Sequence, residues 1–118
     1  MWQHTKLDAY RKAVRVAIEL EAISAKIPHH RLDLRDQLRR ASSSIPFNIA
    51  EGANEFSPAE KARIHRIARR SAGESAAILD LVEGLFGGSA DIESARKLLN
   101  DVAAMLTKLI AAMPVKRG

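Results

Sequence analysis

The chain has 118 residues, enough for one domain with a hydrophobic core. Hydrophobic residues make up 47% of it and cysteine is absent, which excludes a disordered chain, a disulfide framework and thiolate metal sites. Nineteen basic and 14 acidic residues give a net charge of +5, of which residues 31–70 carry +4. This excess favours anionic partners. No apolar run reaches the roughly 18 residues that cross a membrane, and the N-terminus lacks a signal-peptide pattern, so we expect a cytoplasmic protein without membrane contacts.

Apolar residues at spacings of three and four predict a first helix over residues 6–27. They form two adjacent stripes, so this helix is expected to be buried on more than one side. Thr5 is the candidate N-cap, and Pro28 ends the helix. The His29–His30 pair that follows, like His65, is expected at the surface.

A second helix is predicted over residues 33–52, with Pro46 in its interior. Proline lacks an N–H and crowds the carbonyl four residues earlier, at a cost of about 3 kcal/mol. The helix could end at Ile45 and restart, but the apolar spacing continues in phase past the proline, which favours a continuous, kinked helix. The hydroxyls of serines 42–44 are expected to help satisfy the freed backbone groups. Gly52 is expected to close the helix in a left-handed conformation.

The third and fourth helices are predicted over residues 58–85 and 90–113. The run Ser57–Glu60 places serine at the N-cap, proline at the first helical position and glutamate at the third. Gly73 costs about 1 kcal/mol in a helix interior, which suggests close packing against another helix there. The glycine-rich run Phe86–Ser89 is the loop between the two helices.

Four helices joined by short loops predict an all-α domain over residues 1–118, an antiparallel up-down-up-down four-helix bundle whose second helix is kinked at Pro46. Residues 115–118 are expected to fray. The short loops offer little material for a lid or pocket, so no small-molecule substrate is expected.

Three stretches resemble the bacterial four-helix bundle family first described as open reading frames in 23S rRNA intervening sequences. They are Gln37–Gly52, Ile67–Ser75 and, more weakly, Leu7–Ala13. The resemblance implies a four-helix bundle that assembles into a ring-like homo-oligomer, a pentamer. A related bundle is the basic accessory protein of diversity-generating retroelements, which binds nucleic acid and a reverse transcriptase. This chain departs from that pattern, because residues 71–118 carry a net charge of −1.

Arginines on the second and third helices form a candidate surface for nucleic acid or another anion, because guanidinium groups match phosphate geometry. The candidates are Arg35, Arg39, Arg40, Arg63, Arg66, Arg69 and Arg70. The alternatives are a solvated face with local salt bridges, or arginines at a subunit interface. The sequence has no base-reading motif and no aromatic stacking platform, so any RNA or DNA binding is expected to depend on the phosphate backbone and on salt.

Asn48, Glu51 and Glu74 lie near the apolar faces of two neighbouring helices. We interpret them as a structural polar network, paired by an arginine and fixing helix register. The alternative is an acid/base pair of glutamates. The sequence contains no Glu-x-x-His metal motif, no nucleophile elbow and no Walker A loop. No catalytic residue, metal or cofactor is therefore expected.

The leading functional hypothesis is a non-enzymatic, homo-oligomeric scaffold or binding protein with an arginine-rich surface for RNA, DNA or an acidic protein. The alternative is a protein–protein adaptor with no affinity for nucleic acid. A third class, an enzyme using Glu51 and Glu74, is disfavoured by the missing motifs.

Overall fold

The computed structural model describes residues 2–114. Two short 3-10 segments and four long helices follow in the order η1 (Gln3–Lys6), α1 (Asp8–Ala25), η2 (His29–Arg31), α2 (Leu32–Ala53), α3 (Pro58–Phe86) and α4 (Ala90–Ala111). No strand occurs between residues 2 and 114, so the predicted all-α class is confirmed. The prediction for residues 115–118 lies outside the described range.

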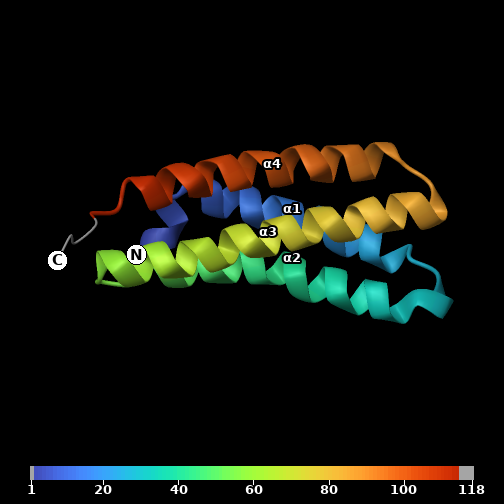
Figure 1. Ribbon diagram of the computed structural model, residues 1–118, viewed down its shortest axis with the longest axis horizontal. Helices are drawn as coiled ribbons and strands as arrows, with labels where there is room; N and C mark the ends of the chain where they lie inside the picture. Colours follow the sequence, from blue (N-terminus) through green and yellow to red (C-terminus); the bar gives the residue numbers. More distant parts are fainter. Residues whose placement is uncertain (1, 115–118) are drawn as a thin grey trace.

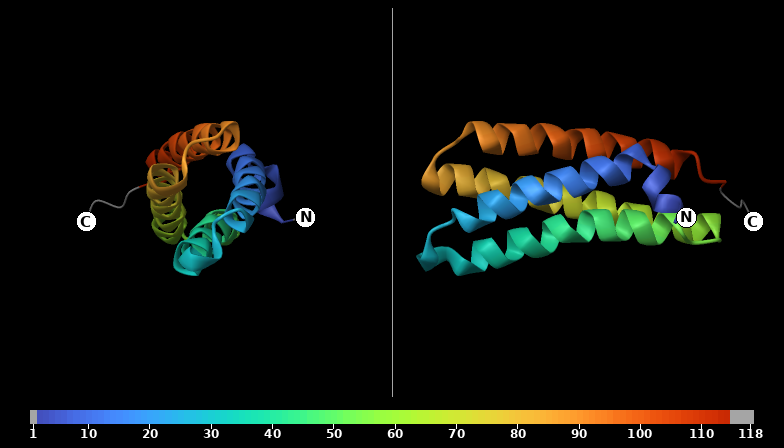
Figure 2. Two further views of the ribbon diagram at one scale, coloured as in Figure 1. Left: turned by 90° about the vertical axis from the view of Figure 1, so that its right-hand side faces the viewer. Right: turned by 180° about the vertical axis from the view of Figure 1, so that it is seen from behind.

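Each long helix packs against two others, α1 against α2 and α4, and α3 against α2 and α4. Seen along the long axis, the helices surround a shared interior (Figure 2). The α1–α2 and α3–α4 connections lie at one end, and the α2–α3 connection lies at the other end together with η1 (Figure 1).

The shared interior is filled by apolar side chains that recur every three or four residues on each helix. The largest fully buried ones include Leu20, Leu38, Ile45, Ile49, Leu79, Leu99 and Leu106. Burying one such side chain stabilises a fold by about 1.5–3 kcal/mol. The core, which all four helices share, therefore fixes their arrangement.

Serine caps begin α3 and α4. Ser57 Oγ accepts a hydrogen bond from the N–H of Glu60 at 3.3 Å, which confirms the predicted start of α3. Ser89 Oγ accepts from the N–H of Ile92 at 3.1 Å. Between the caps, Gly87 has a φ of 94°, a value that side chains disfavour, and it ends α3.

The N-terminus differs from the prediction. Thr5 does not cap the first helix, because its hydroxyl donates to the carbonyl of Trp2 at 2.8 Å within η1. Leu7 is then extended, with ψ at 126°, and α1 starts only at Asp8. The first helix is therefore shorter than the predicted range 6–27, and η1 lies beside the end of α2, where the N–H of Gln3 donates to the side chain of Asn54 at 2.9 Å.

Two predictions about glycine are wrong. Gly73 was expected at a close helix contact, but it is exposed, and a Cβ added there meets no atom within 4 Å. Gly52 was expected to be left-handed at the end of its helix, but α2 continues through it to Ala53, and the positive φ within the described range belongs to Gly87.

Pro46 lies buried inside α2, which runs through it without a break. The expectation that the helix continues is met. The hydroxyls of Ser42 and Ser43 donate to the carbonyl of Arg39, at 3.2 Å and 2.9 Å. Neither hydroxyl donates to the carbonyl of Ser42, which has no helical donor because Pro46 lacks an N–H.

Candidate functional site

Arg35 and Arg39 are turned toward α1 and its connection rather than toward α3. Arg35 donates from Nη2 to the carbonyl of Ile27 at 2.7 Å. Arg39 forms an ion pair with Glu21 of α1, with 3.1 Å between Nε and Oε1. The Nε of Arg35 is buried without a hydrogen-bond acceptor in the described chain. The contacts with Ile27 and Glu21 commit both side chains to the packing of α2 on α1 and its connection.

Arg63 and Arg69 also have partners within the chain. Arg63 forms an ion pair of 3.0 Å with Glu60 one turn earlier. Their hydrogen bond lowers the pKa of Glu60 and raises the pKa of Arg63. Arg69 Nη1 donates to Thr107 Oγ1 of α4 at 3.3 Å, which draws it away from α2.

The other three predicted arginines, Arg40, Arg66 and Arg70, are exposed. Unlike those of Arg39 and Arg63, their guanidinium groups form no ion pair or hydrogen bond with another residue of the range 2–114. They are therefore the predicted arginines that keep their full donor capacity for a partner.

A hydrogen bond between α2 and α3 sets the level of these arginines. The hydroxyls of Ser44 and Ser71 lie 2.8 Å apart. Arg70 directly precedes Ser71, and Arg40 is one turn before Ser44, which is about 6 Å along the axis. Because α2 and α3 run in opposite directions from their shared connection, Arg40 lies on one side of this bond, and Arg70 and Arg66 lie on the other side, toward the connection (Figure 1). The three arginines are therefore spread over about 14 Å along two adjacent helices.

The polar network between α2 and α3 involves other residues than predicted. Asn48 Nδ2 donates to the carbonyl and to the hydroxyl of Ser44, at 2.8 Å and 2.9 Å, and Ser44 Oγ bonds Ser71 Oγ. Glu51 and Glu74 are exposed, and no hydrogen bond joins them to Asn48 within the described residues. The small hydroxyl and amide groups, which fit between close helices, replace the carboxylates in this role.

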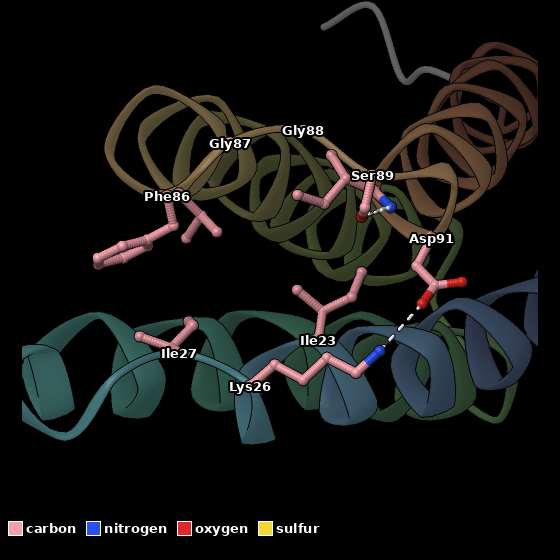
Figure 3. A pocket seen from close by; sticks show the side chains of 10 residues that line it. Ile23, Lys26, Ile27, Phe86, Gly87, Gly88, Ser89 and Asp91 are labelled. Atoms are coloured by element: carbon pink, nitrogen blue, oxygen red, sulfur yellow. Dashed lines mark hydrogen bonds and ion pairs between the residues drawn. The ribbon is translucent and has the colours of Figure 1, made fainter.

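One pocket lies at the end of the bundle that carries the α3–α4 connection (Figure 3). Lys26 reaches across it to Asp91, with 3.2 Å between Nζ and Oδ2. Ser89 Oγ is already used to cap α4. The charges and donors of this pocket are thus satisfied within the chain. Among residues 2–114, no group of three metal-ligating side chains occurs.

A buried histidine marks the other end of the bundle, against the prediction that the histidines lie at the surface. His65 of α3 is 1% exposed, and its Nδ1 has no hydrogen-bond partner among the described residues. Its ring lies against Gly52, where an added Cβ would come within 2.8 Å of Cε1. Gly52 is therefore needed for space rather than for a turn. The signal in the sequence was the position of His65 three residues before the buried Ala68.

The sequence profile of the 23S rRNA-intervening sequence protein family matches residues 5–108, which is most of the chain. The chain belongs to this family. A solved structure from Bacteroides thetaiotaomicron, described as a protein of unknown function from the S23 ribosomal protein family, has the same fold, with a TM-score of 0.76 and 21% sequence identity. The match covers 86% of this chain and 97% of that one. A comparison with curated proteins finds no match.

Membership of the 23S rRNA-intervening sequence family confirms the resemblance carried by the stretches around Pro46 and Gly73. The likeness to the Bacteroides structure supports the fold alone at this identity. No helix within residues 2–114 combines the length and the apolar character needed to cross a membrane.

Proposed function

We propose that this member of the 23S rRNA-intervening sequence family is a non-enzymatic, homo-oligomeric binding protein of the bacterial cytoplasm that holds RNA or DNA through Arg40, Arg66 and Arg70. The observation that carries the proposal is that these three arginines are exposed and unpaired within the described chain. Exposed guanidinium groups bind phosphate oxygens through charge-assisted hydrogen bonds. The absence of cysteine is in keeping with a reducing compartment such as the cytoplasm. Cell fractionation tests this location.

The charge distribution supports the same surface. Residues 31–70, which include all three arginines, carry the largest share of the net charge of +5. Binding through such a surface would be independent of base sequence, because phosphate contacts position a nucleic acid without reading it. Glu51 and Glu74, the carboxylates of the disfavoured enzyme hypothesis, are both exposed to water.

The double variant Arg66→Gln, Arg70→Gln is expected to bind single-stranded RNA more weakly at every salt concentration. Each lost phosphate contact should reduce the slope of log K against log salt concentration by about 0.7. Fluorescence anisotropy with a labelled oligonucleotide, from about 50 to 200 mM salt, measures both quantities.

The matched control is Arg15→Gln on α1, since Arg15 is also an exposed arginine on a helix. Its affinity should stay close to that of the unmodified protein. If the unmodified protein does not bind RNA or DNA even at the lowest salt, the nucleic-acid part of the proposal is wrong. The chain would then be a protein–protein adaptor, with an acidic protein as the partner for these arginines.

Exposed large apolar side chains support the homo-oligomer. Phe47 is 71% exposed on the outer side of α2, and Ile18 is 66% exposed on α1. Exposed large apolar groups often mark protein interfaces, where aromatic residues are enriched. The assembly we propose is the ring-like pentamer implied by the family resemblance.

The variant Phe47→Ser is expected to lower the oligomeric state while leaving the helical content unchanged, because Phe47 lies outside the core. Light scattering coupled to size-exclusion chromatography gives the mass. The corresponding change at Phe56, which is 95% exposed at the α2–α3 connection, is the control. A monomeric unmodified protein would contradict the assembly.

The proposal includes an up-down-up-down helix order and a bend of α2 at Pro46. Consecutive connections at alternate ends of the bundle support the order (Figure 1). The missing N–H at Pro46 and the crowding of its ring support the bend. An experimental structure that shows a straight axis through Pro46 would contradict it.

A further inference from the structure

A cavity of about 450 Å³ lies at the end of the bundle where η1, the start of α3 and the end of α4 meet. This volume is within the range of small-molecule sites. Its apolar lining includes Leu7, Leu109 and Met113. Its polar lining includes Lys6, Lys61 and His65. An apolar surface that also presents two lysine ammonium groups fits a ligand that is itself divided into an apolar part and an anionic part.

A second cavity, of about 270 Å³, adjoins the first, because Leu7 and Leu109 line both. It is mainly apolar and follows the contact between the start of α1 and the end of α4 past Met105. Lys108 also lines it. The one acidic side chain in the two linings, Asp8, is neutralised by an ion pair with Arg11. Together the cavities offer a continuous apolar surface with three lysines in its lining, Lys6, Lys61 and Lys108.

Of Lys61 and His65 in the larger cavity, only Lys61 retains bonding capacity for a ligand, because the buried Nδ1 of His65 lies against Gly52 instead of facing the cavity. Lys61 Nζ donates to the carbonyls of Ala53 and Gly52, at 2.9 Å and 3.4 Å. An ammonium group has three donors, so Lys61 keeps one for a ligand. A positive group held at this point by backbone carbonyls is already oriented before a ligand arrives.

We propose that the two cavities form one binding site for an amphiphilic anion, an unbranched aliphatic carboxylate. The carboxylate would accept hydrogen bonds from Lys61 and Lys6 beside His65, and the alkyl chain would lie along Leu7 and Leu109 toward Met105. This site is separate from the arginines Arg40, Arg66 and Arg70, so the proposal does not depend on nucleic-acid binding.

Decanoate is the probe for the full-length protein. Trp2, the one tryptophan in the chain, directly precedes the cavity residue Gln3, so its fluorescence reports binding, and calorimetry checks the stoichiometry. We expect saturable binding of one decanoate per chain. Octanoate should bind about tenfold more weakly, because two methylene groups fewer are buried. Acetate, which lacks the chain, should not bind.

Lys6→Gln and Lys61→Gln should each weaken decanoate binding by about tenfold, through loss of a charge-assisted hydrogen bond. Lys6 is exposed, so its variant keeps the test valid if Lys61→Gln fails to fold. Lys97→Gln, on the exposed side of α4, is the control and should bind normally. Absence of saturable binding, equal binding of 1-decanol, or unchanged affinity in the Lys6→Gln variant would each overturn the proposal.

Discussion

Replacement of Gly52 by alanine is expected to destabilise the bundle by about 1–3 kcal/mol, the usual cost of overfilling a packed interior. The new Cβ would lie 2.8 Å from Cε1 and 2.9 Å from Nδ1 of His65. The imidazole is 1% exposed, so it cannot swing into water to make room without breaking the packing between α2 and α3. Urea denaturation followed by circular dichroism measures the change in the free energy of unfolding.

Gly73→Ala is the matched control, since Gly73 is also a helical glycine but has open space around it. Alanine is the better helix former, so this variant should be more stable by about 0.5–1 kcal/mol. Adding His65→Ala to Gly52→Ala should cost less than the two single changes together, because the smaller side chain removes the clash. A Gly52→Ala protein as stable as the Gly73→Ala protein would show that the His65 contact does not constrain α2.

The fold was predictable because apolar residues at helical spacing identify a helix whatever its neighbours are. Leu38 and Ile45 fall on one stripe, and both are buried. The start of α3 was equally clear, since Ser57 caps by a local hydrogen bond that depends on adjacent residues alone.

The arrangement of polar side chains around each helix was less predictable. Arg39 and Arg40 are adjacent in sequence, yet Arg39 pairs with α1 and Arg40 faces solvent. Helical spacing gives the angle between two side chains but not the direction of the neighbouring helices. The single arginine-rich surface expected from the sequence is therefore divided, and three of its seven members remain free of partners within the described chain.

Gly52 and His65 were misjudged for a related reason. A glycine near a helix end usually marks a left-handed turn, and a histidine is usually exposed. Here the two residues compensate one another across α2 and α3, because the missing side chain of Gly52 makes room for the ring of His65. Such a pair depends on the register of the two helices, which no local pattern contains.

His65 is expected to make the stability of the bundle fall as the pH decreases below about 6.5. Burial lowers the pKa of His65 from the ordinary value of 6.5, and the nearby charge of Lys61 lowers it further. The unfolded chain therefore takes up a proton at a higher pH than the folded one. Above pH 6.5 the free energy of unfolding should have its full value. Below pH 6.5 it should decrease by up to about 1.4 kcal/mol per pH unit, until His65 is protonated in the folded state as well.

Urea denaturation between pH 7.5 and 5.5 measures this decline, and a His65→Gln variant provides the comparison, because glutamine does not titrate. The variant should be less stable at neutral pH but depend less on pH, and the contributions of the other histidines cancel between the two proteins. The carboxylates of Asp33 and Glu60 have pKa values lowered by Arg31 and Arg63, so their effects fall at lower pH. Equal pH dependence of both proteins would mean that the folded chain accommodates a charged His65, which the close contact with Gly52 allows only after a rearrangement.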